Sequence, residues 1–126
     1  KILCGNKREG ALFSPTAVDH CKPDSAMVMD ETIGPVAPII RVKDVEEACK
    51  IANSTEFGLQ SGVVTNNLDN IKYCIKHLKV GAVNINEGPQ HDMPNIPFGG
   101  VKQSGVGREG IRYAMQEMTY IKCVVM

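Results

Sequence analysis

The central part of the chain alternates strand-like apolar runs with segments of helical periodicity. Residues 36–42, 59–65 and 80–85 are rich in aliphatic and β-branched side chains, which favour strands. Residues 44–52 and 68–78 carry apolar side chains at the spacing of an amphipathic helix. Strands that alternate with helices of this length are joined by right-handed crossovers. The order therefore predicts an α/β fold with three layers, a mostly parallel sheet and flanking helices.

The remaining segments give less regular patterns. Residues 1–24 mix short apolar stretches with Gly, Pro and Asp, so we expect extended pieces joined by turns. Asp44 is predicted to cap the helix that follows it. Residues 86–110 form a long loop, residues 111–118 a third amphipathic helix, and residues 120–126 a β-prone strand without a visible mate. A loop of that length inside a compact domain is usually functional.

Charge and composition exclude several classes of protein. Lys and Arg total 14 against 14 for Asp and Glu, and no cluster of basic side chains exists to bind nucleic acid or an anionic membrane. No apolar run approaches the ~20 residues that span a bilayer. The five cysteines are far apart and form no Cys-x-x-Cys, which argues against a zinc site or a disulfide framework. Reduced thiols of this kind predict a cytoplasmic location.

The cysteines are weak candidates for a nucleophile, because no feature of the sequence indicates a site that lowers the pKa of a thiol. We expect Cys4, Cys49, Cys74 and Cys123 to be small buried hydrophobes. Cys21 follows His20, and this pair remains the alternative of an independent thiol enzyme. Adjacent loop residues rarely face one another, so a solvated loop is favoured there.

Two features of the long loop could carry chemistry. Residues 105–110 match the G-x-G-x-x-G pattern of dinucleotide-binding loops, although no strand leads directly into them and only 16 residues follow. His91, beside Asp92, could contact a substrate or carry a proton, because histidine titrates near neutrality. The alternative for His91 is an ordinary solvated loop.

Three motifs together resemble a known family. Residues 30–36 read Asp-Glu-Thr-Ile-Gly-Pro-Val, residues 97–105 read Pro-Phe-Gly-Gly-Val-Lys-Gln-Ser-Gly, and Gly107-Arg108-Glu109 follows. With residues 80–86 between them, they resemble the C-terminal part of the aldehyde dehydrogenase superfamily in content and order. The endings around the loop are most similar to lactaldehyde and non-phosphorylating glyceraldehyde-3-phosphate dehydrogenases.

The resemblance implies a division of the chain and a set of site residues. Residues 1–101 would be the C-terminal portion of the catalytic domain, residues 102–118 the glycine-rich loop and helix, and residues 119–126 an oligomerisation strand. The implied cofactor is NAD or NADP. By resemblance, its nicotinamide ribose hydroxyls are held by Glu31, and its ring lies against Ile33, where the family commonly has Phe. The implied substrate residues are His91 and Phe98.

The resemblance also implies an activity that this chain does not complete. Family members oxidise an aldehyde through a cysteine thiohemiacetal and thioester, and the cysteine, the glutamate base and the nucleotide-binding domain normally precede this segment. We therefore expect no catalytic residue here, no activity from this chain alone, and a parent enzyme acting on a small polar aldehyde. A homo-oligomer is expected through residues 120–126, from Tyr120 to Met126. The alternative is a non-catalytic binding or oligomerisation module derived from such an enzyme.

Overall fold

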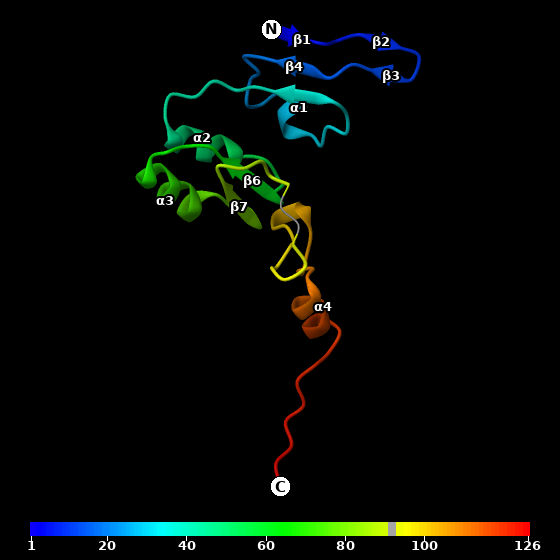
Figure 1. Cartoon of the computed structure of the whole chain (residues 1–126), viewed down its shortest axis with the longest axis vertical. Helices are drawn as coiled ribbons and strands as arrows, with labels where there is room; N and C mark the ends of the chain where they lie inside the picture. Colours follow the sequence, from blue (N-terminus) through cyan, green and yellow to red (C-terminus); the bar gives the residue numbers. More distant parts are fainter. Residues whose placement is uncertain (91–92) are drawn as a thin grey trace. The chain divides into compact units, whose positions relative to one another are not determined.

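The computed structural model describes residues 1–90 and 93–126. Its contacts divide the chain into two compact units, Lys1–Thr55 and Glu56–Met126. Most elements of each unit are labelled in Figure 1, and each unit is described by itself.

The first unit contains a small mixed sheet with strand order β1-β4-β5. Its strands are β1 (Ile2–Cys4), β4 (Thr16–Val18) and β5 (Val36–Pro38). β1 runs antiparallel to β4, whereas β4 and β5 are parallel with Thr16 opposite Val36. A two-stranded antiparallel hairpin of β2 (Arg8–Glu9) and β3 (Leu12–Phe13) lies between β1 and β4 in sequence. The prediction of extended pieces joined by turns over residues 1–24 is confirmed.

β5 is shorter than the strand predicted over residues 36–42. Backbone pairing continues only to Ile39, whose N–H donates to the Val18 carbonyl. The next residues of the neighbouring strand cannot extend the ladder, because His20 has a φ of 56° and leaves the extended conformation. The partner strand therefore limits β5, and a reading of β5's own composition could not detect that limit.

A short helix and a longer helix complete the first unit. α1 (Ala26–Met29) precedes β5, and α2 (Val45–Ala52) follows it. The predicted N-cap of α2 is confirmed, since Oδ1 of Asp44 accepts the N–H of Glu47 at 2.8 Å. The Glu47 carboxylate in turn accepts the N–H of Lys43 at 2.9 Å, which satisfies a second donor at the start of the helix.

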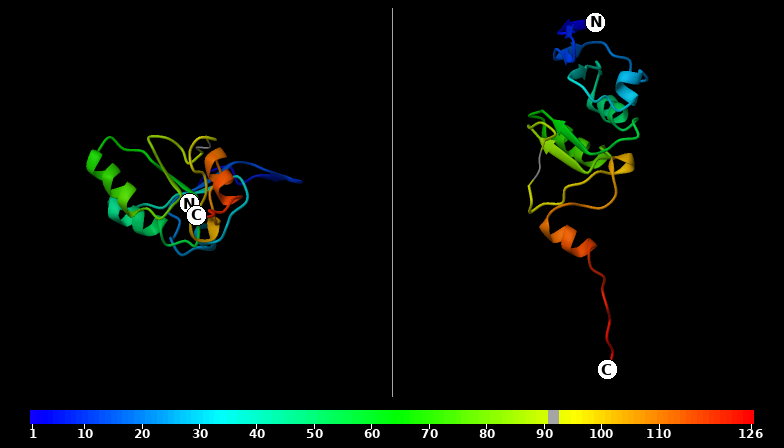
Figure 2. Two further views of the ribbon diagram at one scale, coloured as in Figure 1. Left: turned by 90° about the horizontal axis from the view of Figure 1, so that it is seen from below. Right: turned by 90° about the vertical axis from the view of Figure 1, so that its right-hand side faces the viewer.

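The second unit is built on one parallel strand pair. β6 (Gln60–Val63) and β7 (Ala82–Ile85) pair with Gln60 opposite Ala82, and α3 (Leu68–His77) connects them and contacts β7 (Figures 1 and 2). Asn67 caps α3 through its side-chain oxygen, which accepts the Asp69 N–H at 2.8 Å. This strand-helix-strand unit confirms the crossover that the alternating sequence pattern predicts.

The predicted three-layer parallel sheet is not confirmed. Within the described residues the sheets have three, two and two strands, and the parallel pairs are β4 with β5 and β6 with β7. The β1–β4 and β2–β3 pairs are antiparallel. Alternation along the sequence specifies how consecutive strands are connected, but it does not specify which strands become neighbours.

The last part of the second unit contains η1 (Lys102–Ser104) and α4 (Ile111–Glu117). α4 confirms the third predicted helix. The strand predicted at 120–126, which by resemblance pairs with another subunit, stays a prediction: in this single chain these residues have no regular secondary structure and end as an extended segment, red in Figure 1. A strand needs a hydrogen-bonded neighbour, and the apolar side chains here are exposed, Ile121 fully and Val125 by 90%.

Few side chains are fully buried. Cys49 in α2 and Cys74 in α3 are buried, as predicted, together with three polar residues, Thr16, Asp19 and Asn84. The predicted burial of Cys4 and Cys123 is wrong, since both are exposed. Cys4 lies on the edge strand β1, and Cys123 lies in the unpaired terminal segment. No helix in residues 1–90 or 93–126 has the length and apolar character needed to cross a membrane.

Candidate functional site

The turn over residues 30–35 presents two of the predicted cofactor residues. It begins where the Asp30 N–H closes α1 on the Ala26 carbonyl, and it ends where the Thr16 N–H donates to the Pro35 carbonyl at 2.8 Å. Between these fixed points Glu31 is exposed and Ile33 is 91% exposed. The polar residues and Gly34-Pro35 explain why the chain turns here instead of continuing α1.

The Glu31 carboxylate is available to a ligand. Within the described part of the chain it has no hydrogen-bond or ion-pair partner. An ionised carboxylate only accepts hydrogen bonds, so its chemistry fits a pair of sugar hydroxyls. Ile33, two residues away in the same turn, offers an apolar surface that can contact a ring but cannot stack on it as an aromatic side chain would.

Phe98, the predicted substrate residue, belongs to the second unit and is half-buried. Its backbone forms an antiparallel bridge with Glu109: the Phe98 N–H donates to the Glu109 carbonyl at 3.1 Å, and the return bond is 2.6 Å. The Phe98 side chain thus extends from backbone whose N–H and carbonyl are both paired with Glu109. Glu31 and Ile33 lie in one unit and Phe98 in the other, whereas His91 lies outside the described residues.

The residues after Phe98 are hydrogen-bonded to the residues that precede β6. Gly58 is the centre of this contact: its carbonyl accepts the Val101 N–H at 3.0 Å, and its own N–H donates to Ser104 Oγ at 2.8 Å. Gln103 adds a bond from its N–H to the Glu56 carbonyl and one from its amide to the Glu56 carboxylate, both 2.9 Å. These four bonds attach residues 101–104 of the long loop to the residues that precede β6.

The beginning of the long loop is fixed at the opposite end of the same strands. Asn86, directly after β7, donates its N–H to the Val63 carbonyl at 2.7 Å, and its side-chain oxygen accepts the Thr65 N–H at 2.9 Å. Its φ of 56° lies in the left-handed region, where asparagine is tolerated better than most residues. The segment between Asn86 and Phe98 is therefore held at both of its ends.

The glycine-rich run at 105–110 has a structural explanation. Gly107 has a φ of 82°, and a Cβ there would lie 2.7 Å from the Glu117 carboxylate of α4. The Arg108 N–H donates to that carboxylate at 2.9 Å, and the Arg108 guanidinium donates to the Gly100 carbonyl at 2.8 Å. A cavity of about 230 Å³ lies between this run, Leu59 and Phe98. Gly107 thus allows the run to pack closely against α4, and none of the described strands leads into the run as a dinucleotide-binding loop requires.

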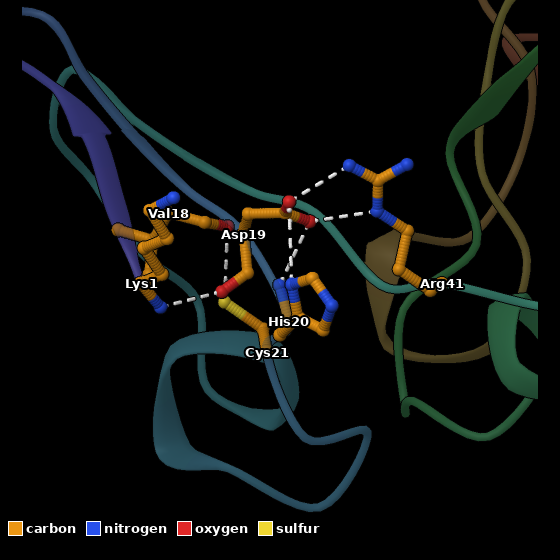
Figure 3. A network of polar contacts seen from close by, with 6 residues as sticks. All are labelled: Lys1, Val18, Asp19, His20, Cys21 and Arg41. Carbon is orange, nitrogen blue, oxygen red and sulfur yellow. Dashed lines mark hydrogen bonds and ion pairs between the residues drawn. The ribbon is translucent and has the colours of Figure 1, made fainter.

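A further polar cluster was not predicted from the sequence (Figure 3). Asp19, just after β4, is 5% exposed, and its carboxylate accepts two bonds from the Arg41 guanidinium, at 2.9 and 2.7 Å. The His20 N–H adds a third bond at 2.8 Å. The Arg41 guanidinium and these hydrogen bonds hold the pKa of Asp19 well below its usual range, against the opposing effect of burial. Only a prediction of the β4–β5 pairing could have brought the two residues together.

The alternative thiol site is not assembled. Cys21 is half-buried, and its Sγ lies 3.3 Å from the Val18 carbonyl oxygen, to which it donates. The His20 ring lies instead beside Asp19, with Nδ1 3.2 Å from the carboxylate, and is largely exposed. The described residues contain no group of three or more His, Cys, Asp or Glu side chains that could hold a metal ion.

Comparison with family models decides what the chain is related to. Residues 1–124 match the model of the aldehyde dehydrogenase family. The chain belongs to this family. The resemblance predicted from the motifs around Glu31 and Phe98 is therefore confirmed.

Individual aldehyde dehydrogenases agree with that assignment. The chain is 44% identical over 125 residues to a sulfoacetaldehyde dehydrogenase of Neptuniibacter caesariensis, and 45% identical over 126 residues to a lactaldehyde dehydrogenase of Methanocaldococcus jannaschii. These alignments cover 99% and 100% of this chain but only 27% of each relative. The chain thus spans about a quarter of the length of the curated aldehyde dehydrogenases that it matches.

A solved aldehyde dehydrogenase structure gives the same result for the fold. The crystal structure of a glyceraldehyde-3-phosphate dehydrogenase of Methanocaldococcus jannaschii, complexed with NADP, is similar with a TM-score of 0.90 and 47% identity. The match covers 97% of this chain and 26% of that one. A second structure, aldehyde dehydrogenase 21 of Physcomitrella patens in complex with succinate, has a TM-score of 0.88 and 38% identity over 94% of this chain and 24% of that one.

Proposed function

We propose that this chain is the C-terminal part of an NAD(P)-dependent aldehyde dehydrogenase that oxidises a small polar aldehyde to its acid. The observation that carries the proposal is the family match over residues 1–124, which includes both the Glu31 turn and the fastened Phe98 segment. The chain spans only about a quarter of its relatives. The cysteine that forms the thiohemiacetal and thioester is therefore assigned to sequence outside these residues.

The proposed role of the first unit is to bind the cofactor. The exposed Glu31 carboxylate would accept hydrogen bonds from the two nicotinamide ribose hydroxyls, and Ile33 would contact the ring. The free acceptor atoms of Glu31 support this assignment, because hydroxyl groups are the donors that a lone carboxylate matches. When bound, NAD(P)⁺ supplies the hydride acceptor of the reaction.

The proposed role of the second unit is to contact the substrate. Phe98 would form an apolar wall of the substrate site, and the segment between Asn86 and Phe98, which includes His91, would select the aldehyde. The relatives are named for lactaldehyde, sulfoacetaldehyde and glyceraldehyde 3-phosphate, which are short aldehydes with polar substituents. We therefore place the substrate in that chemical class.

The proposed role of residues 120–126 is assembly. Their exposed apolar side chains, including Ile121, Val124 and Val125, suit a strand that pairs with the sheet edge of another subunit. A homo-oligomer follows from this proposal.

Turnover tests the proposal directly. The complete reading frame containing this segment is expressed, and NAD(P)H formation is followed with lactaldehyde, sulfoacetaldehyde and glyceraldehyde 3-phosphate. We expect turnover of at least one aldehyde by the complete protein and none by the 126-residue chain. Absence of turnover by a folded, oligomeric complete protein would favour the alternative, a non-catalytic binding or oligomerisation module.

The cofactor assignment has its own test with a matched control. Glu31→Gln keeps the size of the side chain but removes its charge, so the dissociation constant of NAD(P) should rise by roughly tenfold, the effect of weakening hydrogen bonds to a charged group. Glu9→Gln makes the same change at an exposed glutamate of the β2–β3 hairpin and should leave cofactor binding unchanged. Equal NAD(P) binding by Glu31→Gln and Glu9→Gln would show that Glu31 does not contact the cofactor.

A further inference from the structure

The Asp19–Arg41 pair joins the carboxyl ends of two parallel strands. Asp19 is the residue after β4, and Arg41 is three residues beyond β5. The Arg41 Nε and terminal nitrogen donate to the two different oxygens of Asp19, at 2.9 and 2.7 Å, in a fork-to-fork arrangement (Figure 3). Such two-point pairing fixes orientation as well as distance.

The burial of the pair is unequal, which makes the carboxylate dependent on its partner. The Asp19 side chain is 6% exposed and the Arg41 side chain 66% exposed. Without the guanidinium, Asp19 would keep its two contacts with His20, from the backbone N–H and from Nδ1 at 3.2 Å, but it would lose both bonds from Arg41, so a displaced Arg41 leaves a buried carboxylate without its main partner. The arrangement therefore favours one alignment of the two strands.

The backbone ladder between these strands is short. It contains three residue pairs, beginning with Thr16 and Val36, and one bond beyond each end, from the Thr16 N–H to the Pro35 carbonyl at 2.8 Å and from the Ile39 N–H to the Val18 carbonyl at 2.7 Å. β5 itself has no buried residue. The alignment of β5 thus depends on few bonds, to which the ion pair beyond its end adds two, and a slip by one residue would move the strand by ~3.3 Å.

The alignment of β5 determines where the Glu31 turn ends. Pro35 directly precedes β5, and its carbonyl accepts the Thr16 N–H from the start of β4 at 2.8 Å. Glu31 is four residues before Pro35 in the same turn. Displacement of β5 along β4 would consequently displace the end of the turn that presents the Glu31 carboxylate.

We propose that Asp19 and Arg41 are positioning residues for cofactor binding, because their ion pair fixes the β4–β5 register and thereby the position of Glu31. The inference rests on the proposed role of Glu31. It adds two residues that do not contact the cofactor themselves, and it assigns to them an effect on cofactor binding that acts through the turn.

The test is a double-mutant cycle in the complete protein. Asp19→Asn keeps the shape and hydrogen-bond acceptor of the side chain but removes the charge that holds Arg41. We expect the dissociation constant of NAD(P) to rise by up to about tenfold, the rise expected for Glu31→Gln, because the substitution acts only through Glu31. In the Asp19→Asn variant, the KM for the aldehyde should change less than the KM for NAD(P). In the Glu31→Gln background the same substitution should change cofactor binding less than twofold.

A second variant and a control separate positioning from general damage. Arg41→Lys retains the positive charge but loses the two-point hydrogen bonding of the guanidinium. It should therefore raise the dissociation constant of NAD(P) less than Asp19→Asn does. Lys43→Met removes a nearby basic side chain whose ion pair with Asp44 is exposed and 3.9 Å long, and it should leave binding unchanged. Hydrogen exchange gives a readout without cofactor: the Thr16 amide should exchange faster in Asp19→Asn than in Lys43→Met.

The outcomes distinguish this inference from the proposal beneath it. If Glu31→Gln binds NAD(P) normally, the role of Glu31 fails, and the positioning inference fails with it. If Glu31→Gln weakens binding but Asp19→Asn does not, only the positioning inference is overturned. Equal effects of Asp19→Asn with and without Glu31 would also overturn it, because Asp19 would then act by another route.

Discussion

Asn86 and Thr65 are joined across the carboxyl ends of β6 and β7. The Asn86 side-chain oxygen accepts the Thr65 N–H at 2.9 Å, while the Asn86 N–H donates to the Val63 carbonyl at 2.7 Å. One residue therefore continues the strand pairing by two hydrogen bonds and simultaneously turns the chain into the long loop with its φ of 56°.

Substitutions at Asn86 should separate the side-chain bond from the backbone conformation. Asn86→Ala loses the bond and keeps a left-handed residue with a Cβ, so it should destabilise the loop base by about 2 kcal/mol. Asn86→Gly loses the bond but relieves the conformational cost, and Asn86→Asp keeps the acceptor. The Thr65 amide hydrogen should exchange fastest in Asn86→Ala, more slowly in Asn86→Gly and most slowly in Asn86→Asp. Identical exchange in all three variants would contradict this account.

Gly81 should tolerate no side chain. A Cβ at Gly81 would overlap the Gly99 carbonyl, so Gly81→Ala must displace backbone that adjoins Phe98. Overpacking of this kind costs about 1–3 kcal/mol, and thermal unfolding should report it. Gly88→Ala is the matched control, since a Cβ there meets nothing closer than 3.8 Å. A Gly81→Ala protein with unchanged stability would show that the Phe98 segment can move away freely.

The free energy of unfolding should fall at acid pH because of Asp19. Its pKa in the folded state is lowered, by Arg41 first, whereas an unfolded Asp titrates near ~3.9. Asp19 therefore contributes stability that is fully present above that value and is lost as the pH falls through the folded-state pKa. Urea unfolding midpoints below pH ~4 should fall more steeply in the unmodified protein than in Asp19→Asn. Asp24→Asn, at an exposed position, should keep the steep fall.

The terminal segment should control assembly. Ile121→Lys and Val124→Lys place charges on side chains that are 100% and 73% exposed in this chain, so folding within the subunit should be unaffected. In the proposed strand addition they would oppose pairing with a second subunit. Light scattering of the complete protein should show smaller species for the double variant. Lys122→Met, between the two positions, serves as the control and should leave the mass unchanged.

Sequence patterns predicted the local elements of this chain well. α2, α3 and α4 follow from apolar residues at helical spacing, and Asp44 caps α2 as expected. These features depend on neighbours in the sequence. The end of β5 was predicted wrongly, because strand length depends on a partner that periodicity does not reveal, and the strand at residues 120–126 stays a prediction that only a second subunit can test.

The candidate site was predicted only in part for the same reason. Glu31, Ile33 and Phe98 were predicted through motifs and stay predictions as site residues, while the structure shows the backbone bonds at the end of the Glu31 turn and at Phe98. The Asp19–Arg41 pair is separated by 22 residues and has no motif, so only the β4–β5 pairing brings it together. The role of Gly58 in fastening the Phe98 segment likewise depends on a contact across 46 residues.

The hydrogen bonds at both ends of the segment between Asn86 and Phe98 affect how the sequence of this segment can vary. Apart from the Asn86 side chain, Asn86 and Phe98 are held by main-chain bonds, to Val63 and Glu109. Backbone bonds do not depend on which side chains occupy the intervening positions. Insertions and replacements between these two points can therefore accumulate without altering the strand pair that holds them.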